Sequence, residues 1–168
     1  MKSLLALAIV CLPVTLGCAA SPEDSTEGDA TAREPADASR PIPFRVLLET
    51  TQSRVVAPGG VVIEDAAAFG SLWAACTGHR LPAPALPPID WRTERVLCIA
   101  AGPRPSAGFS IRVDAIEHDD RGEGVTTVRY AETTPVAGSV QAQMISHPVQ
   151  IVAIARRGGE VRFLSPSR

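Results

Sequence analysis

The chain has 168 residues, of which 45% are hydrophobic and 4% aromatic, and it carries a formal net charge of −2. This length allows one ordinary domain and a tail, with a core that must consist mainly of Val, Ile, Leu and Ala. Lys2 is the only lysine, and no segment is strongly basic. The composition therefore argues against a nucleic-acid-binding surface, and nucleic acid is not an expected partner.

The N-terminal segment has the features of an export signal. Lys2 precedes an apolar run from Leu4 to Leu16, which is shorter than the ~20 residues that a membrane-spanning helix needs. The run ends in Thr-Leu-Gly-Cys, which resembles a lipobox, a signal in which a small residue precedes an acylated cysteine. We therefore predict a lipoprotein signal peptide over residues 1–17 and lipidation of Cys18, with ordinary cleavage after Ala19 as the alternative. The anchor would place the protein in the bacterial cell envelope, with the outer membrane favoured.

Residues 18–40 are expected to form a disordered acidic tether. They are rich in Ala, Ser, Pro and Thr and contain six acidic side chains against two arginines, so they offer almost nothing to bury. The folded domain is expected over residues 41–168.

One amphipathic helix is predicted within residues 62–79. Its apolar face is formed by side chains at positions i, i+3, i+4 and i+7, which are Phe69, Leu72, Trp73 and Cys76. Glu64 and Asp65 suit the positive end of such a helix, and Gly78 suits its end. After it, four prolines between Arg80 and Trp91 favour an extended connector, and Trp91 is expected to pack on the core.

The remaining segments predict short strands separated by Gly, Pro and Asp turns. The predicted strands are residues 44–49, 59–64, 95–102, 108–116, 124–132, 149–156 and 160–164. Their regular spacing predicts a fold of the α+β class that is mostly β, namely an antiparallel sandwich or half-open barrel with one packed helix.

The sequence also predicts which face of one strand is buried and where two hairpin turns lie. Alternation from residue 109 to residue 116 places Phe109, Ile111, Val113 and Ala115 on a buried face. Residues 117–125 are expected to form a hairpin turn, and residues 156–160 another.

Cys76 and Cys98 are the two cysteines of the predicted domain. An oxidising compartment would allow a disulfide between the helix and a strand. Both positions are also apolar, so two buried thiols explain the pattern equally well. The sequence leaves these alternatives open.

No catalytic, metal or cofactor site is predicted. His79, His118 and His147 lie outside any nucleophile, zinc or metalloprotease motif and are expected at the surface or in turns. The acidic turn at residues 118–124 lacks the alternating ligands of a calcium loop. The glycine-bounded loop at residues 102–108 lacks a phosphate-loop ending, and its prolines remove N–H donors.

Several segments, in this order, resemble the C-terminal domain of the protease complex subunit PrcB family. They are a helix sequence ending in Leu-Trp, an Ile-Asp-Trp step, the loop Gly-Pro-Arg-Pro-Ser-Ala-Gly-Phe, and a segment with Glu132, Pro135 and Pro148. In the loop, Arg104, Pro105 and Gly108 match the family pattern, whereas Ser106, Ala107 and Phe109 replace Thr, Gly and Tyr. The resemblance extends over residues 42–164.

The resemblance implies a small β-rich domain, often on a bacterial lipoprotein, whose namesake is a non-catalytic subunit that supports a surface protease. We therefore expect a membrane-anchored, non-enzymatic accessory protein that contacts an envelope or secreted protein, a protease among them. The hypothetical contact loop comprises Arg104, Pro105, Ser106, Gly108 and Phe109, because prolines hold Arg104 in place. The alternatives are a purely structural turn that starts a strand at Phe109, and a protease inhibitor that presents the same loop.

Overall fold

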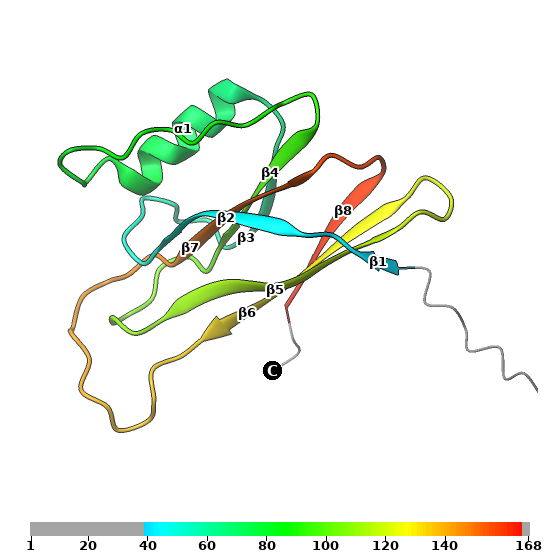
Figure 1. Ribbon diagram of the computed structural model, residues 1–168. Helices are drawn as coiled ribbons and strands as arrows, with labels where there is room; N and C mark the ends of the chain where they lie inside the picture. Colours follow the sequence, from blue (N-terminus) through cyan, green and yellow to red (C-terminus); the bar gives the residue numbers. More distant parts are fainter. Residues whose placement is uncertain (1–38, 166–168) are drawn as a thin grey trace, which may run out of the picture. The chain divides into compact units, whose positions relative to one another are not determined.

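The computed structural model describes residues 39–165 and shows one helix and eight strands (Figure 1). Their bounds are β1 Ser39–Pro41, β2 Phe44–Thr50, β3 Gly59–Ile63, α1 Ala66–Thr77, β4 Glu94–Ala100, β5 Ser110–Asp119, β6 Val125–Thr133, β7 Val149–Ala155 and β8 Glu160–Leu164. The predicted signal peptide, the lipidation site at Cys18 and nearly all of the predicted tether lie outside the described residues.

The strands form two four-stranded sheets, in the orders β1-β5-β6-β8 and β2-β7-β4-β3. Every pairing is antiparallel except the one between β6 and β8, which is parallel. The predicted class, mostly β with one packed helix, is confirmed, and all seven predicted strands are present. Sequence analysis missed β1, because three residues are too few to show alternation.

Two apolar clusters occupy the two faces of the β2-β7-β4-β3 sheet. Leu97 and Ile99 of β4 point into the cluster between the sheets, whereas Val96 and Cys98 point into the cluster beneath the helix. Successive strand residues face opposite sides, so a strand buried on both sides must be apolar at nearly every position. This explains the uninterrupted apolar runs of β4 and β7, the two central strands.

Helix α1 begins and packs as its sequence predicts. Asp65 is the N-cap, and its side chain accepts a hydrogen bond from the Ala68 N–H at 2.8 Å. The predicted face is turned inward, with Phe69, Trp73 and Cys76 buried and Leu72 partly buried.

The proline-rich connector is fixed to the helix by two tryptophans. The Trp73 indole N–H donates to the Pro84 carbonyl at 3.0 Å. The Trp91 ring packs edge-on against Phe69 with centroids 5.8 Å apart, so the expectation that Trp91 joins the core is confirmed. Leu81 remains 96% exposed on this connector.

The predicted alternation in β5 is correct only for its first half. Ile111 and Val113 are buried, but a bulge at Asp114 shifts the register, so Ile116 and His118 point inward and Ala115 is half-buried. Phe109 lies before the strand and is half-buried, so the expectation that it is the first buried residue of the strand was wrong. Ile111 takes that place.

The turn at residues 156–160 does not form a hairpin, which corrects the second turn prediction. It carries the chain from β7 to β8, which joins the other sheet beside β6. A Cβ at Gly159 would lie 1.9 Å from the Gly124 carbonyl oxygen. The glycine therefore allows this turn to pass directly against the tip of the β5–β6 hairpin. That hairpin itself was predicted correctly.

Candidate functional site

Three loops meet at one end of the two sheets, at the left of Figure 1. They follow β2, β4 and β6, and we call this region the loop end, comprising residues 51–58, 101–109 and 134–148. Backbone hydrogen bonds tie the loops together: the Ala107 N–H donates to Ala142, and the His147 N–H donates to Thr51. The predicted contact loop is thus one of three connected segments.

Arg104 of the predicted contact loop forms an internal ion pair with Glu132, at the end of β6. Its Nε donates to Glu132 Oε1, and its Nη2 donates to Oε2 at 2.8 Å. The side chains are 25% and 15% exposed, and the hydrogen bond to Glu132 raises the pKa of Arg104 above its ordinary value. Arg104 is a bidentate donor as expected, but its acceptor belongs to the same chain.

The rest of the predicted loop is also held from within. Arg104 and Ser146 exchange two backbone hydrogen bonds, of 2.8 and 3.0 Å, and the Ser146 hydroxyl donates to the Ser106 carbonyl at 2.9 Å. Gly108 has a φ of +88°, so the positive φ falls on the glycine that this chain retains. Pro105 is exposed, whereas Ser106 and Phe109 are half-buried. These contacts attach the loop to residues 142–146 of the same chain.

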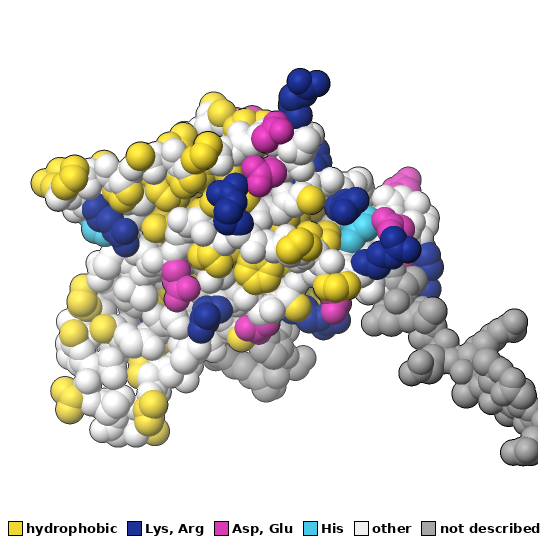
Figure 2. Space-filling model, viewed as in Figure 1, with side chains coloured by type: hydrophobic (Ala, Val, Ile, Leu, Met, Phe, Trp, Pro, Cys, Tyr) yellow, Lys and Arg dark blue, Asp and Glu magenta, His cyan; other side chains and the backbone are white. Residues whose placement is uncertain are grey.

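The loop from residue 134 to residue 148 carries an exposed apolar surface that sequence analysis overlooked. Four large side chains on it remain in solvent: Val136 at 78% exposure, Val140 at 99%, Met144 at 42% and Ile145 at 65%. Figure 2 shows hydrophobic atoms gathered on this loop, at the lower left. No Asp, Glu, Lys or Arg occurs between Glu132 and Arg156, and His147 is the one histidine there. This long uncharged stretch was the available sequence signal.

A cleft of about 330 Å³ adjoins the same end. Its walls come from the end of β2 and the start of its loop, the two residues after the helix C-cap, and the start of β5. The lining residues are Glu49, Thr50, Thr51, Gln52, His79, Arg80, Ser110 and Ile111. The cleft therefore brings together residues far apart in the sequence, none of which was predicted as a site residue.

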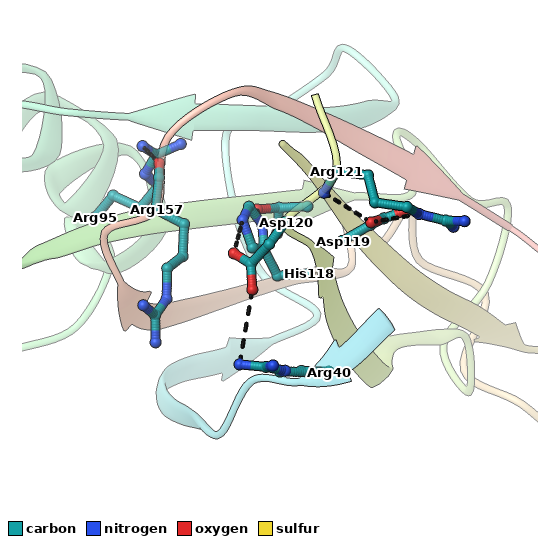
Figure 3. A network of polar contacts seen from close by, with 8 residues as sticks. Arg40, Arg95, His118, Asp119, Asp120, Arg121 and Arg157 are labelled. Atoms are coloured by element: carbon teal, nitrogen blue, oxygen red, sulfur yellow. Dashed lines mark hydrogen bonds and ion pairs between the residues drawn. The ribbon is translucent and has the colours of Figure 1, made fainter. Parts of the chain in front are cut away.

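The opposite end of the sheets holds a network of polar contacts (Figure 3). His118 Nε2 lies 3.2 Å from Asp120 Oδ1, and its Nδ1 lies 2.9 Å from the Thr126 hydroxyl. Figure 3 shows Asp120 between His118 and Arg40 of β1, whose Nη1 is 3.9 Å from Asp120 Oδ2. His118 is only 6% exposed, so the expectation of a surface position was wrong for this histidine.

Cys76 and Cys98 are free, buried thiols within the cluster beneath the helix. Burial raises the pKa of Cys76 to about 11. Burial also raises the pKa of Cys98, to about 12, with a further contribution from Cys76. Both thiols are therefore protonated and unreactive at neutral pH.

Residues 39–165 contain no group of three or more His, Cys, Asp or Glu side chains arranged to hold a metal ion. Within the same range, the helix is neither long nor apolar enough to cross a bilayer.

Comparison with known proteins gave one match. The model of the family described as PrcB C-terminal matches residues 95–155, from the start of β4 to the end of β7. No curated protein and no solved structure matched the chain. The matched segment contains both Arg104 and Glu132 and all of the exposed apolar loop. The resemblance to the PrcB family is thus confirmed over residues 95–155, where the chain is similar to the PrcB C-terminal domain.

Proposed function

We propose that this protein is a non-enzymatic accessory subunit that contacts another envelope or secreted protein, a protease in the first instance, through its loop end. The PrcB family match supports an association with a protease complex. A lipid anchor at Cys18 and a tether belong to the same proposal, because they would hold the domain at the membrane and leave its loops accessible. The tether would end before residue 39, because Ser39 and Arg40, which were predicted as part of it, belong to β1.

The exposed apolar loop is the observation that carries this proposal. Val136, Val140 and Ile145 are each more than 60% exposed on a loop that contains no Asp, Glu, Lys or Arg. Depletion of charge is typical of the centre of a protein interface. The loop is also braced by the contacts of Ser146 and Ala142 to residues 104–107, so little conformational entropy would be lost on binding.

The inhibitor alternative receives less support from these contacts. An inhibitory loop must offer its side chains to the protease cleft, but Arg104 already directs its guanidinium to Glu132. An Arg104→Ala variant would also break this internal ion pair, so it would not isolate a contact with a partner. Variants on the apolar loop are cleaner probes.

Photo-crosslinking of the full-length chain in its native host tests the proposal. A photoreactive amino acid replaces Val140 on the loop end or, as the control, Glu123 at the tip of the β5–β6 hairpin. Both positions are exposed and lie at opposite ends of the sheets. We expect a discrete protein adduct from position 140 that position 123 does not give, with the partner identified by mass spectrometry.

Equal adducts from both positions, or none from either, would contradict the proposal. If the partner is a protease, its activity is then measured as the purified full-length chain is added. An accessory subunit would leave the protease activity unchanged or raise it. A stoichiometric loss of activity would establish the inhibitor alternative.

A further inference from the structure

The cleft at the loop end has a mixture of hydrogen-bonding groups. Glu49 supplies an acceptor, Arg80 supplies donors, and the Thr51 and Ser110 hydroxyls can act as either. The backbone N–H of Arg80 donates to the Thr77 carbonyl at 2.8 Å. Its exposed side chain forms no hydrogen bond or ion pair with the other residues that the structure describes. A ligand could therefore engage its guanidinium without breaking an existing contact.

A buried side chain fixes the acceptor of the cleft. The Gln150 amide N–H donates to Glu49 Oε2 at 3.2 Å, and its carbonyl oxygen accepts from the Val113 N–H at 2.6 Å. Gln150 is only 2% exposed. Because these bonds determine the orientation of its amide, Glu49 is held by a rigid group behind the cleft wall.

Apolar residues border this polar cleft. The Met144 sulfur accepts a hydrogen bond from Gln52 Nε2 at 3.9 Å, which places the exposed apolar loop at one wall. The same loop leaves β6 next to Ser110, whose register partner is Thr133. On the other wall, Arg80 is followed directly by the almost fully exposed Leu81.

We propose that this cleft binds an extended, uncharged peptide segment of the partner protein. Each peptide unit carries one N–H donor and one C=O acceptor. Glu49 could accept from a peptide N–H, and Arg80 could donate to a peptide carbonyl. Met144 and Leu81 would contact apolar side chains of the peptide, while the opposite charges of Glu49 and Arg80 leave no net charge to attract a charged ligand. This inference rests on the proposed accessory function and specifies the part of the partner that is recognised.

Selection from a phage-displayed library of random dodecapeptides on the immobilised full-length chain tests the inference. The affinity of selected peptides is then measured by fluorescence polarisation for the wild type and for Arg80→Ala and Met144→Ser variants. Arg92→Ala is the matched control, because Arg92 is exposed near the start of β4, at the other end of the sheet. We expect about a tenfold weaker affinity for each cleft variant and less than a twofold change for Arg92→Ala.

An absence of enriched peptides would overturn the inference. So would peptides that bind Arg80→Ala and Met144→Ser as tightly as the wild type. Urea unfolding of each variant verifies that the folded state is retained, as expected for exposed positions. If crosslinking from position 140 still identifies a partner, the accessory function survives and only the peptide site falls. If selected peptides bind the cleft and no partner is crosslinked from position 140, the peptide site is supported and the proposed accessory function is contradicted.

Discussion

Arg104 and Glu132 are separated by 28 positions in the chain, and their paired side chains join the loop after β4 to the end of β6. Both residues belong to the segments that carry the family resemblance, in the Arg-Pro loop and in the later Glu and Pro motif. The pairing gives these two short motifs a common physical role: they position the loop end. This role is structural, and it makes Arg104 a supporting residue of the proposed contact surface.

Glu132→Gln is expected to lower the free energy of unfolding by about 1–3 kcal/mol, because the half-buried guanidinium of Arg104 loses its charged acceptor. Urea denaturation measures the change. Glu160→Gln is the control, since Glu160 and Arg162 form an ion pair in which both side chains are more than half exposed. Solvent screens such a pair, so its loss should lower the free energy of unfolding less than the loss of the Arg104 pair. Equal effects of the two substitutions would show that the Arg104 pair adds no stability of its own.

Asp119 at the end of β5 is expected to titrate at an unusually low pH. Hydrogen bonds from the Arg121 side chain and backbone, with smaller effects of neighbouring charges, lower the pKa of Asp119 from 3.8 to about 2. A lowered pKa means that the ionised form stabilises the fold above the unfolded-state pKa, and that this stability is lost as pH falls toward 2. Carboxyl NMR titration should give a pKa near 2 for the wild type and a value closer to 3.8 for Arg121→Gln. An unchanged pKa in the variant would contradict the assignment of the shift to Arg121.

Residue-level predictions from the sequence failed where a local irregularity changed the pattern. Strict alternation could not anticipate the bulge at Asp114, which turns His118 inward. Phe109 resembles a core residue by type, but the strand begins one residue later, at Ser110. The acceptor of Arg104 was also not foreseen, because a sequence does not reveal which carboxylate a distant loop will meet.

At the scale of elements, the contact between α1 and β4 brings Cys76 and Cys98 into one apolar cluster. Alkylation of the unfolded protein without reductant, followed by peptide mass spectrometry, should modify both residues. The folded protein at neutral pH should leave both unmodified, because burial keeps the thiols protonated and inaccessible. If neither cysteine is alkylated until reductant is added, the disulfide alternative is correct.

Most elements were predictable because the signals that form them are local. The helix has both an N-cap at Asp65 and an apolar face, and the strands have alternating or continuous apolar patterns between turn residues. Strand partners were harder to predict, because pairing depends on contacts between distant segments. The two glycines before β8 looked like a hairpin turn, and the sequence does not reveal that Gly159 packs closely against Gly124 where the chain crosses to the other sheet.

At the scale of the molecule, the described domain should unfold in one cooperative step. The β2-β7-β4-β3 sheet contributes side chains to both apolar clusters, so neither layer can separate without exposing the other face of the same strands. Trp73 and Trp91, the two tryptophans of the chain, report the helix layer by fluorescence, while far-UV circular dichroism reports the sheets. Their urea midpoints should coincide. An earlier tryptophan transition would show that the helix layer melts separately.

The short first strand has a mechanical consequence. β1 pairs with β5 through three residues and belongs to one sheet, whereas β2 follows almost at once in the other sheet and lies along β7. A pulling force that enters the domain from its N-terminal side would reach β1 first. Peeling off three residues lengthens the chain by about 10 Å at the extension of a strand. β1 would therefore detach from β5 before the force acts on β2 and the core.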